Sequence, residues 1–109
     1  MIEDTVTSSA DGHYLLDLSG DDFHRGENSI ELCVIEAETG HPALDLRLEL
    51  LPFMPAMGHG SSAVSSSVAT IDGCYAFDGV VLSMPGTWEL RTTIQGKISD
   101  FASPKLYLD

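Results

Sequence analysis

The chain has 109 residues and a formal net charge of −12, from 17 acidic and 5 basic side chains. Its length suits one domain and is too short for two, and a hydrophobic content of 43% indicates a folded chain. The charge argues against binding to nucleic acid, whose phosphates require a basic face, and against docking on anionic lipid. No apolar run approaches the roughly 20 residues that span a membrane.

The N-terminal residues are acidic and polar, which is not the pattern of a signal peptide. We expect residues 1–11 to form a flexible N-terminal segment and residues 12–109 to form a single β-sandwich domain. Two hypotheses on location stay open. The protein is cytoplasmic, or it belongs outside the cytoplasm and its leader or anchor is missing from this chain.

Alternation of apolar and polar residues predicts β-strands along the rest of the chain. In one strand Leu44, Leu46, Leu48 and Leu50 share a face, and in another Trp88, Leu90, Thr92 and Ile94 do so. Turn residues separate about seven such runs, which is typical of an all-β, immunoglobulin-like antiparallel β-sandwich. Strands are expected over residues 13–18, 29–36, 44–51, 64–71, 74–82, 87–95 and 98–108. The run at 64–71 is the weakest, because its serines give it little to bury.

One loop does not look like ordinary turn sequence. Residues 52–60 read PFMPAMGHG, so that Met54 and Met57 lie three residues apart and His59 follows two residues later. Methionine normally fills cores, whereas these two lie among prolines and glycines. Another methionine, Met84, lies in a second loop, Ser-Met-Pro-Gly.

Sandwich topology predicts where these loops meet. If residues 64–71 make one pass of chain, three loops lie at the same end of the sandwich. The first carries Met54, Met57 and His59, the second carries Met84, and the third carries His24. Two further histidines, His13 and His41, fall at the opposite end, and we treat them as surface residues.

Thioether and imidazole groups that converge from strand ends suit a soft ion, and thioether in particular selects Cu(I). Zn²⁺ would require more histidine, cysteine or carboxylate than this end offers. The sequence therefore predicts a copper site that binds Cu(I). Its candidate ligands are Met54, Met57 and His59, with Met84 as a fourth ligand and His24 as an outside candidate.

Three motifs in order also resemble a known family. The loop PFMPAMGH at 52–59, the strand start Gly73-Cys74-Tyr75 and the segment Met84-Pro85-Gly86-Thr87-Trp88 are similar to the P-x-M-P-x-M-x-H, G-x-Y and M-x-G-x-W motifs of YtkA-like domains, over about residues 28–95. The resemblance implies an immunoglobulin-like sandwich located outside the cytoplasm, periplasmic or membrane-tethered. It also implies a part in copper handling or oxidase assembly, with an acceptor protein in the cell envelope as partner. The resemblance leads us to expect a leader or anchor, which these 109 residues do not include, so the location stays open.

Other hypotheses stay open beside the copper site. Phe53, Met54 and Met57 could plug the open end of the sandwich while His59 donates a hydrogen bond to a loop carbonyl. The methionines could also form an apolar contact surface of a protein-interaction domain; such a surface has no need of His59, whereas a metal site does. Carbohydrate recognition would require an exposed aromatic platform, and the few aromatics are predicted to point mostly inward. We do not expect an enzyme, since the chain has no Gly-rich phosphate loop, G-x-S-x-G elbow or C-x-x-C pair.

The two cysteines are predicted to face outward on neighbouring strands. Cys33 lies in the run 29–36 and Cys74 begins the run 74–82, and these strands are adjacent in the immunoglobulin arrangement. A disulfide could join them in an oxidising compartment, but the estimated register sets them about three residues apart, and disulfide geometry is demanding. Because Cys74 starts its strand at the end away from the methionines, neither thiol is expected to be a ligand.

Overall fold

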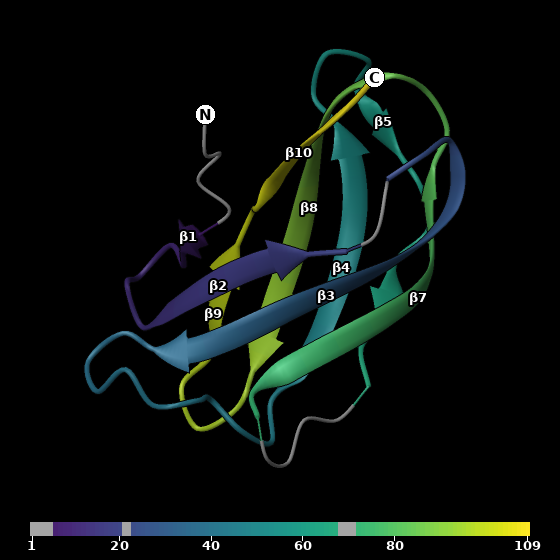
Figure 1. The fold of residues 1–109 in the computed structure, drawn as a ribbon. Coiled ribbons are helices and arrows are strands. Elements are labelled where there is room, and N and C mark those ends of the chain that lie inside the picture. Colours follow the sequence, from purple (N-terminus) through teal and green to yellow (C-terminus); the bar gives the residue numbers. More distant parts are fainter. Residues whose placement is uncertain (1–5, 21–22, 68–71) are drawn as a thin grey trace.

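The computed structural model describes residues 6–20, 23–67 and 72–109, and they form two antiparallel sheets packed as a sandwich (Figure 1). The predicted fold class is confirmed. Within the described ranges no helix is long and apolar enough to cross a membrane. The strands are β1 (Val6–Ser8), β2 (Tyr14–Ser19), β3 (Gly26–Glu36), β4 (Arg47–Met54), β5 (His59–Gly60), β6 (Val64–Ser65), β7 (Cys74–Leu82), β8 (Gly86–Gln95), β9 (Asp100–Ala102) and β10 (Lys105–Leu108).

The first sheet has the strand order β1-β2-β3-β7, and the second has the order β10-β8-β4-β5, with β6 also paired to β4 and β9 also paired to β8. The predicted C-terminal strand at 98–108 is one antiparallel pass interrupted at Ser103-Pro104. Ala102 pairs with Thr92 and Lys105 pairs with Glu89 in the same register. The prolyl residue has no N–H to donate, but its carbonyl accepts from Leu90 N at 2.7 Å.

The core consists of the inward rows that the alternation predicts. Trp88, Leu90 and Thr92 have no exposed surface, and Ile94 is 1% exposed. Leu46, Leu48 and Leu50 are buried as expected. The prediction was wrong for Leu44, which is 40% exposed. Its strand begins only at Arg47, and Asp45 adopts a φ of 59°, which breaks the alternation before the strand starts.

The strand expected at 64–71 differs from the observed one. Only Val64–Ser65 is a strand, and residues 68–71 lie outside the described residues. Residues 59–66 nevertheless make one antiparallel pass beside β4, since His59 pairs with Met54, Val64 pairs with Leu50, and Ser66 N donates to Leu48 O. The single pass on which the loop placement depends is therefore present.

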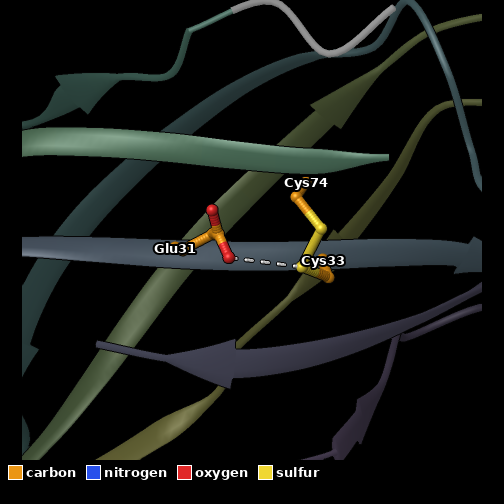
Figure 2. A group of neighbouring side chains, drawn as sticks. All are labelled: Glu31, Cys33 and Cys74. Atoms are coloured by element: carbon orange, nitrogen blue, oxygen red, sulfur yellow. Dashed lines mark hydrogen bonds between the residues drawn. A yellow bond between two sulfur atoms is a disulfide. The ribbon is translucent and has the colours of Figure 1, made fainter. Parts of the chain in front are cut away.

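A disulfide joins Cys33 and Cys74 on the outer face of the first sheet (Figure 2). The two residues are direct partners in the β3–β7 register, so the predicted offset of about three residues was wrong. Strand β3 starts at Gly26, three residues before the predicted start, and Gly26 pairs with Leu82 at the far end of β7. The two strands therefore end together at Gly26 and Leu82, and β3 continues past the start of β7 beyond Cys33.

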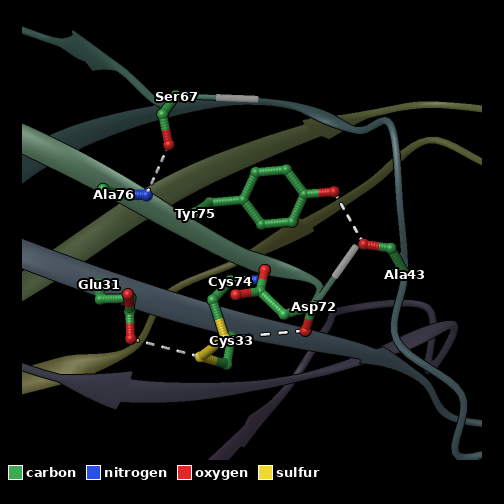
Figure 3. The surroundings of a disulfide bond; sticks show 8 residues. All are labelled: Glu31, Cys33, Ala43, Ser67, Asp72, Cys74, Tyr75 and Ala76. Carbon is green, nitrogen blue, oxygen red and sulfur yellow. Dashed lines mark hydrogen bonds between the residues drawn. A yellow bond between two sulfur atoms is a disulfide. The ribbon is translucent and has the colours of Figure 1, made fainter. Parts of the chain in front are cut away.

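Tyr75, the residue after Cys74, ties the two sheets together (Figure 3). Its buried hydroxyl donates to the carbonyl oxygen of Ala43 at 2.7 Å and accepts from the backbone N–H of Leu46 at 3.0 Å. Burial raises the pKa of this phenol. The two bonds satisfy the polar end of a buried ring and fix the segment that leads into β4.

Candidate functional site

The predicted Met/His loop is the tip of the hairpin between β4 and β5. The carbonyl oxygen of Met54 accepts from the N–H groups of Met57 at 3.1 Å and Gly58 at 2.9 Å, and Gly58 has a φ of 67°. Met54 and His59 are direct register partners where the hairpin closes. Because paired residues in a ladder project to the same side, both side chains leave the hairpin on the core-facing side, and His59 is exposed because β5 is an edge.

Met54 connects this hairpin to the loop that carries Met84. Met54 is only 3% exposed, and a Cβ placed on Gly86 would lie 2.8 Å from its Cε. Gly86 begins β8, two residues after Met84. Met84 is half-buried against the core, and its carbonyl oxygen accepts from Trp88 Nε1 at 3.0 Å. The hairpin and the Met84 loop are therefore in contact.

The β2–β3 connection with His24 lies at the same end. Gly26 pairs with Leu82, the last residue of β7, and Ser61 Oγ donates to Val81 O at 2.6 Å. The segment is held by Asn28, whose Nδ2 donates to His24 O at 2.8 Å. We call the residues 54–59, 83–86 and 23–26 the Met end.

The structure places all five candidate ligands at the Met end, but at different depths. Met54 is buried and Met84 is half-buried, whereas His59 and His24 are exposed and Met57 at the hairpin tip is 52% exposed. The two methionine-bearing loops of the Met end lie in stretches without acidic side chains, because residues 50–71 and 79–88 contain no Asp or Glu. Acidic residues from other segments still lie near these loops, since Leu108 pairs with Gly86 and Asp109 follows it, and Glu27 follows the segment that carries His24.

The opposite end is built around one carboxylate. Asp100 Oδ2 accepts from Ser9 Oγ at 2.6 Å and His13 N at 3.3 Å, and Asp100 Oδ1 accepts from Asp11 N at 3.1 Å and Phe101 N at 2.8 Å. Burial raises the pKa of Asp100, but these hydrogen bonds to the charged form outweigh it and lower the pKa to about 2. We call this cluster the Asp100 end.

Among the described His, Cys, Asp and Glu side chains, two groups have ligand atoms close enough to hold a metal ion, and the sequence prediction named neither. One is Asp11, His13 and Asp100, and the other is Glu31, Cys33 and Cys74, each with its ligand atoms within 4.8 Å of one another. In the first group both oxygens of Asp100 already accept backbone or hydroxyl hydrogens, so the carboxylate has a structural role. In the second group, the alternation pattern did indicate that both cysteines face outward. The predicted offset of about three residues between them concealed that they lie side by side.

Most aromatic residues point inward as predicted, and Phe23 also packs against the core, but others lie on the surface. On the outer face of the second sheet Phe101 is 42% exposed and Tyr107 is 69% exposed. Phe53 is half-buried there, and the guanidinium carbon of Arg91 lies 3.8 Å from its ring centroid, in the geometry of a cation–π contact. Tyr14, Tyr75, Phe77 and Trp88 do point inward.

The comparisons with known proteins identify a family but no individual relative. No significant match was found among curated proteins or among solved structures. The YtkA-like family profile matches residues 5–93, which covers most of the chain and includes the hairpin, the disulfide and the Met84 loop. The chain belongs to the YtkA-like family.

Proposed function

We propose that the protein is a small Cu(I)-binding module and that the Met end holds the ion. The observation that carries this proposal is the contact of Met54 with Gly86, which joins two methionine-bearing loops that contain no Asp or Glu of their own. Thioether sulfur is a soft ligand that favours Cu(I) over Mg²⁺, Ca²⁺ or Zn²⁺. Methionine also has no proton to lose, so its ligation persists at low pH.

The depths of the candidate ligands support a site that opens to solvent. Met54 would form its base and Met84 its wall, while Met57 and His59 would bind from the exposed rim. His24 is an outside candidate on the neighbouring loop. Exposed thioether ligands exchange readily, which suits transfer of Cu(I) to an acceptor protein docked on this end. Given the family, we place the protein outside the cytoplasm, in copper handling or oxidase assembly, and we propose no catalytic activity.

A protein-contact role without metal is the second candidate. The observation that favours it is the 52% exposure of Met57, an apolar side chain at the tip of a hairpin. Methionine is common at adaptable contact surfaces. The two candidates differ in what they require of His59, because an apolar contact has no need of an imidazole.

The test is an anaerobic titration of Cu(I) against a chromophoric chelator. It is done in a Cys33→Ser/Cys74→Ser background, because free thiols would themselves bind Cu(I). We expect one Cu(I) per chain in this background. In the Met57→Ala/His59→Ala variant, whose two side chains are exposed, we expect competitive binding to be lost.

The matched control is His13→Ala/His41→Ala, which removes two imidazoles from the opposite end and should leave the affinity unchanged. Circular dichroism verifies the fold of each variant. The copper proposal is wrong if the Cys33→Ser/Cys74→Ser protein does not bind Cu(I), or if adding Met57→Ala/His59→Ala to it leaves the affinity unchanged. The protein-contact role would then take its place.

A further inference from the structure

We infer that Cys33, Cys74 and Glu31 form a second metal site, open only when the disulfide is reduced, that takes a thiophilic divalent ion such as Zn²⁺. The three side chains offer two sulfurs and one carboxylate, with ligand atoms within 4.8 Å of one another (Figure 2). Sγ of Cys33 lies 3.6 Å from Oε1 of Glu31. The site is on the outer face of the first sheet and shares no residue with the Met end, so it does not depend on the copper proposal.

The backbone holds the two cysteines in place without the disulfide. Cys33 and Cys74 are direct partners in a ladder that runs from Gly26↔Leu82 to Cys33↔Cys74. Beyond it, Val34 N donates to Gly73 O at 2.8 Å. The inward neighbours Leu32 and Tyr75 have no exposed surface. Reduction breaks none of these interactions, so the thiols should stay opposite one another.

Solvent can reach the sulfur atoms. Both cysteines are half-buried, and Glu31 beside them is exposed. The Cα atoms of Cys33 and Cys74 lie 3.9 Å apart. Two sulfurs bound to a tetrahedral Zn²⁺ at about 2.3 Å lie about 3.8 Å from each other, a separation that opposed cysteines reach by side-chain rotation.

The carboxylates around the thiols favour Zn²⁺ over Cu(I). Glu31 precedes Cys33 by two residues on the same face of β3, and Asp17 is the direct partner of Cys33 on β2. Zn²⁺ accepts mixed sulfur and carboxylate ligands, whereas Cu(I) prefers sulfur alone. Water or Asp17 would complete the coordination.

The redox step needs a dithiol reductant. It transfers two electrons and two protons to the S–S bond, which breaks to give two thiols, and the reductant is oxidised to its own disulfide. The metal ion then displaces the two thiol protons into solvent and binds the thiolates. In the reverse direction a disulfide oxidant takes two electrons from the two thiolates and becomes a dithiol, the S–S bond forms again and the ion is released.

The experiment compares the disulfide form with protein reduced by dithiothreitol and freed of reductant under nitrogen. Co²⁺ serves as the probe, because Co²⁺–thiolate ligation has ultraviolet charge-transfer bands, and Zn²⁺ is then added to displace it. We expect one Co²⁺ per reduced chain, displaced by Zn²⁺, and no such band in the disulfide form. Cys33→Ser/Cys74→Ser should abolish the band.

Glu31→Gln keeps both cysteines and should weaken Zn²⁺ binding by the reduced protein at least about tenfold. Glu27→Gln, an exposed glutamate on the same strand, is its matched control. Met57→Ala/His59→Ala should bind Co²⁺ as the parent does. A reduced protein without the band, a Glu31→Gln variant of parent affinity, or loss of the β circular dichroism signal on reduction would each overturn the proposal.

Discussion

Different interactions close the two ends of this sandwich. At the Met end the β4–β5 hairpin is closed by a backbone turn around Met54 O and by apolar burial of Met54 against Gly86. At the Asp100 end a single carboxylate on β9 accepts hydrogen bonds from the β1–β2 turn, which belongs to the other sheet. One closure has no carboxylate in it, and the other depends on one.

This difference bears on function. The Asp100 carboxylate is already engaged at both oxygens, so that end is committed to structure. At the Met end the side chain that closes the sandwich is Met54, while Met57 and His59 extend beyond it into solvent. Met57 and His59 are not needed to close the sandwich, so they are available to a ligand or a partner.

The largest effect should come from Gly60→Ala. A Cβ at this position would overlap the carbonyl oxygen of Pro52 on β4, which is backbone and cannot move away cheaply. The hairpin would have to open, and we expect a loss of more than about 3 kcal/mol in the free energy of unfolding. Urea unfolding followed by tryptophan fluorescence, from the single Trp88, measures it.

Gly58→Ala is the control for that change. Gly58 has a φ of 67°, but a Cβ added there would meet nothing within 4 Å, so only backbone strain of about 1 kcal/mol is expected. Equal losses for the two variants would mean that the hairpin is not held by close approach of β4 and the residue after His59.

The next largest effect should be the difference in stability loss between Met54→Ala and Met57→Ala. Truncating the buried Met54 should cost about 2–3 kcal/mol, since large-to-small changes in a core leave a cavity. Truncating Met57, which is 52% exposed, should change stability by less than about 0.5 kcal/mol. Chemical denaturation measures both; comparable losses would show that Met57 is a structural plug and would weaken the copper proposal.

The sequence predicted what local periodicity determines. Inward rows such as Leu48–Leu50 and Trp88–Ile94 follow from alternation alone, and the order of strands then placed the methionine loops at one end. Register could not be predicted in the same way. The pairing of Cys33 with Cys74 depends on where β3 starts, and the start at Gly26 lies in a run of polar residues with no alternation to mark it.

The candidate site was predictable only in part for a similar reason. The motif identified Met54, Met57 and His59, but the depth of each side chain follows from the hairpin turn and the packing of Gly86. The Asp100 cluster joins residues more than 80 positions apart in the chain. Nothing in the local sequence pattern around Asp100 distinguishes this half-buried residue from the exposed acidic residues of the chain.

Asp100→Asn should destabilise the protein less than Gly60→Ala or Met54→Ala, and the size of its effect should depend on pH. The amide keeps one acceptor oxygen, but its nitrogen cannot accept, so either the Ser9 hydroxyl or the N–H groups opposite lose their partner. We expect a loss of about 1–2 kcal/mol at pH 7. Glu38→Gln, an exposed change near the same end, is the control and should leave stability unchanged.

The pH dependence follows from the pKa of Asp100, which is about 2 in the folded protein against an ordinary value of 3.8. A lowered pKa stabilises the fold at pH values above 3.8, and this contribution is lost as pH falls towards 2 and below. The stability difference between parent and Asp100→Asn should therefore be constant from pH 7 to 5 and shrink between pH 4 and 2. A difference that persists at pH 2 would mean that the charge of Asp100 does not close this end. The Gly60→Ala difference should persist through the same range, because no carboxylate takes part in closing the Met end.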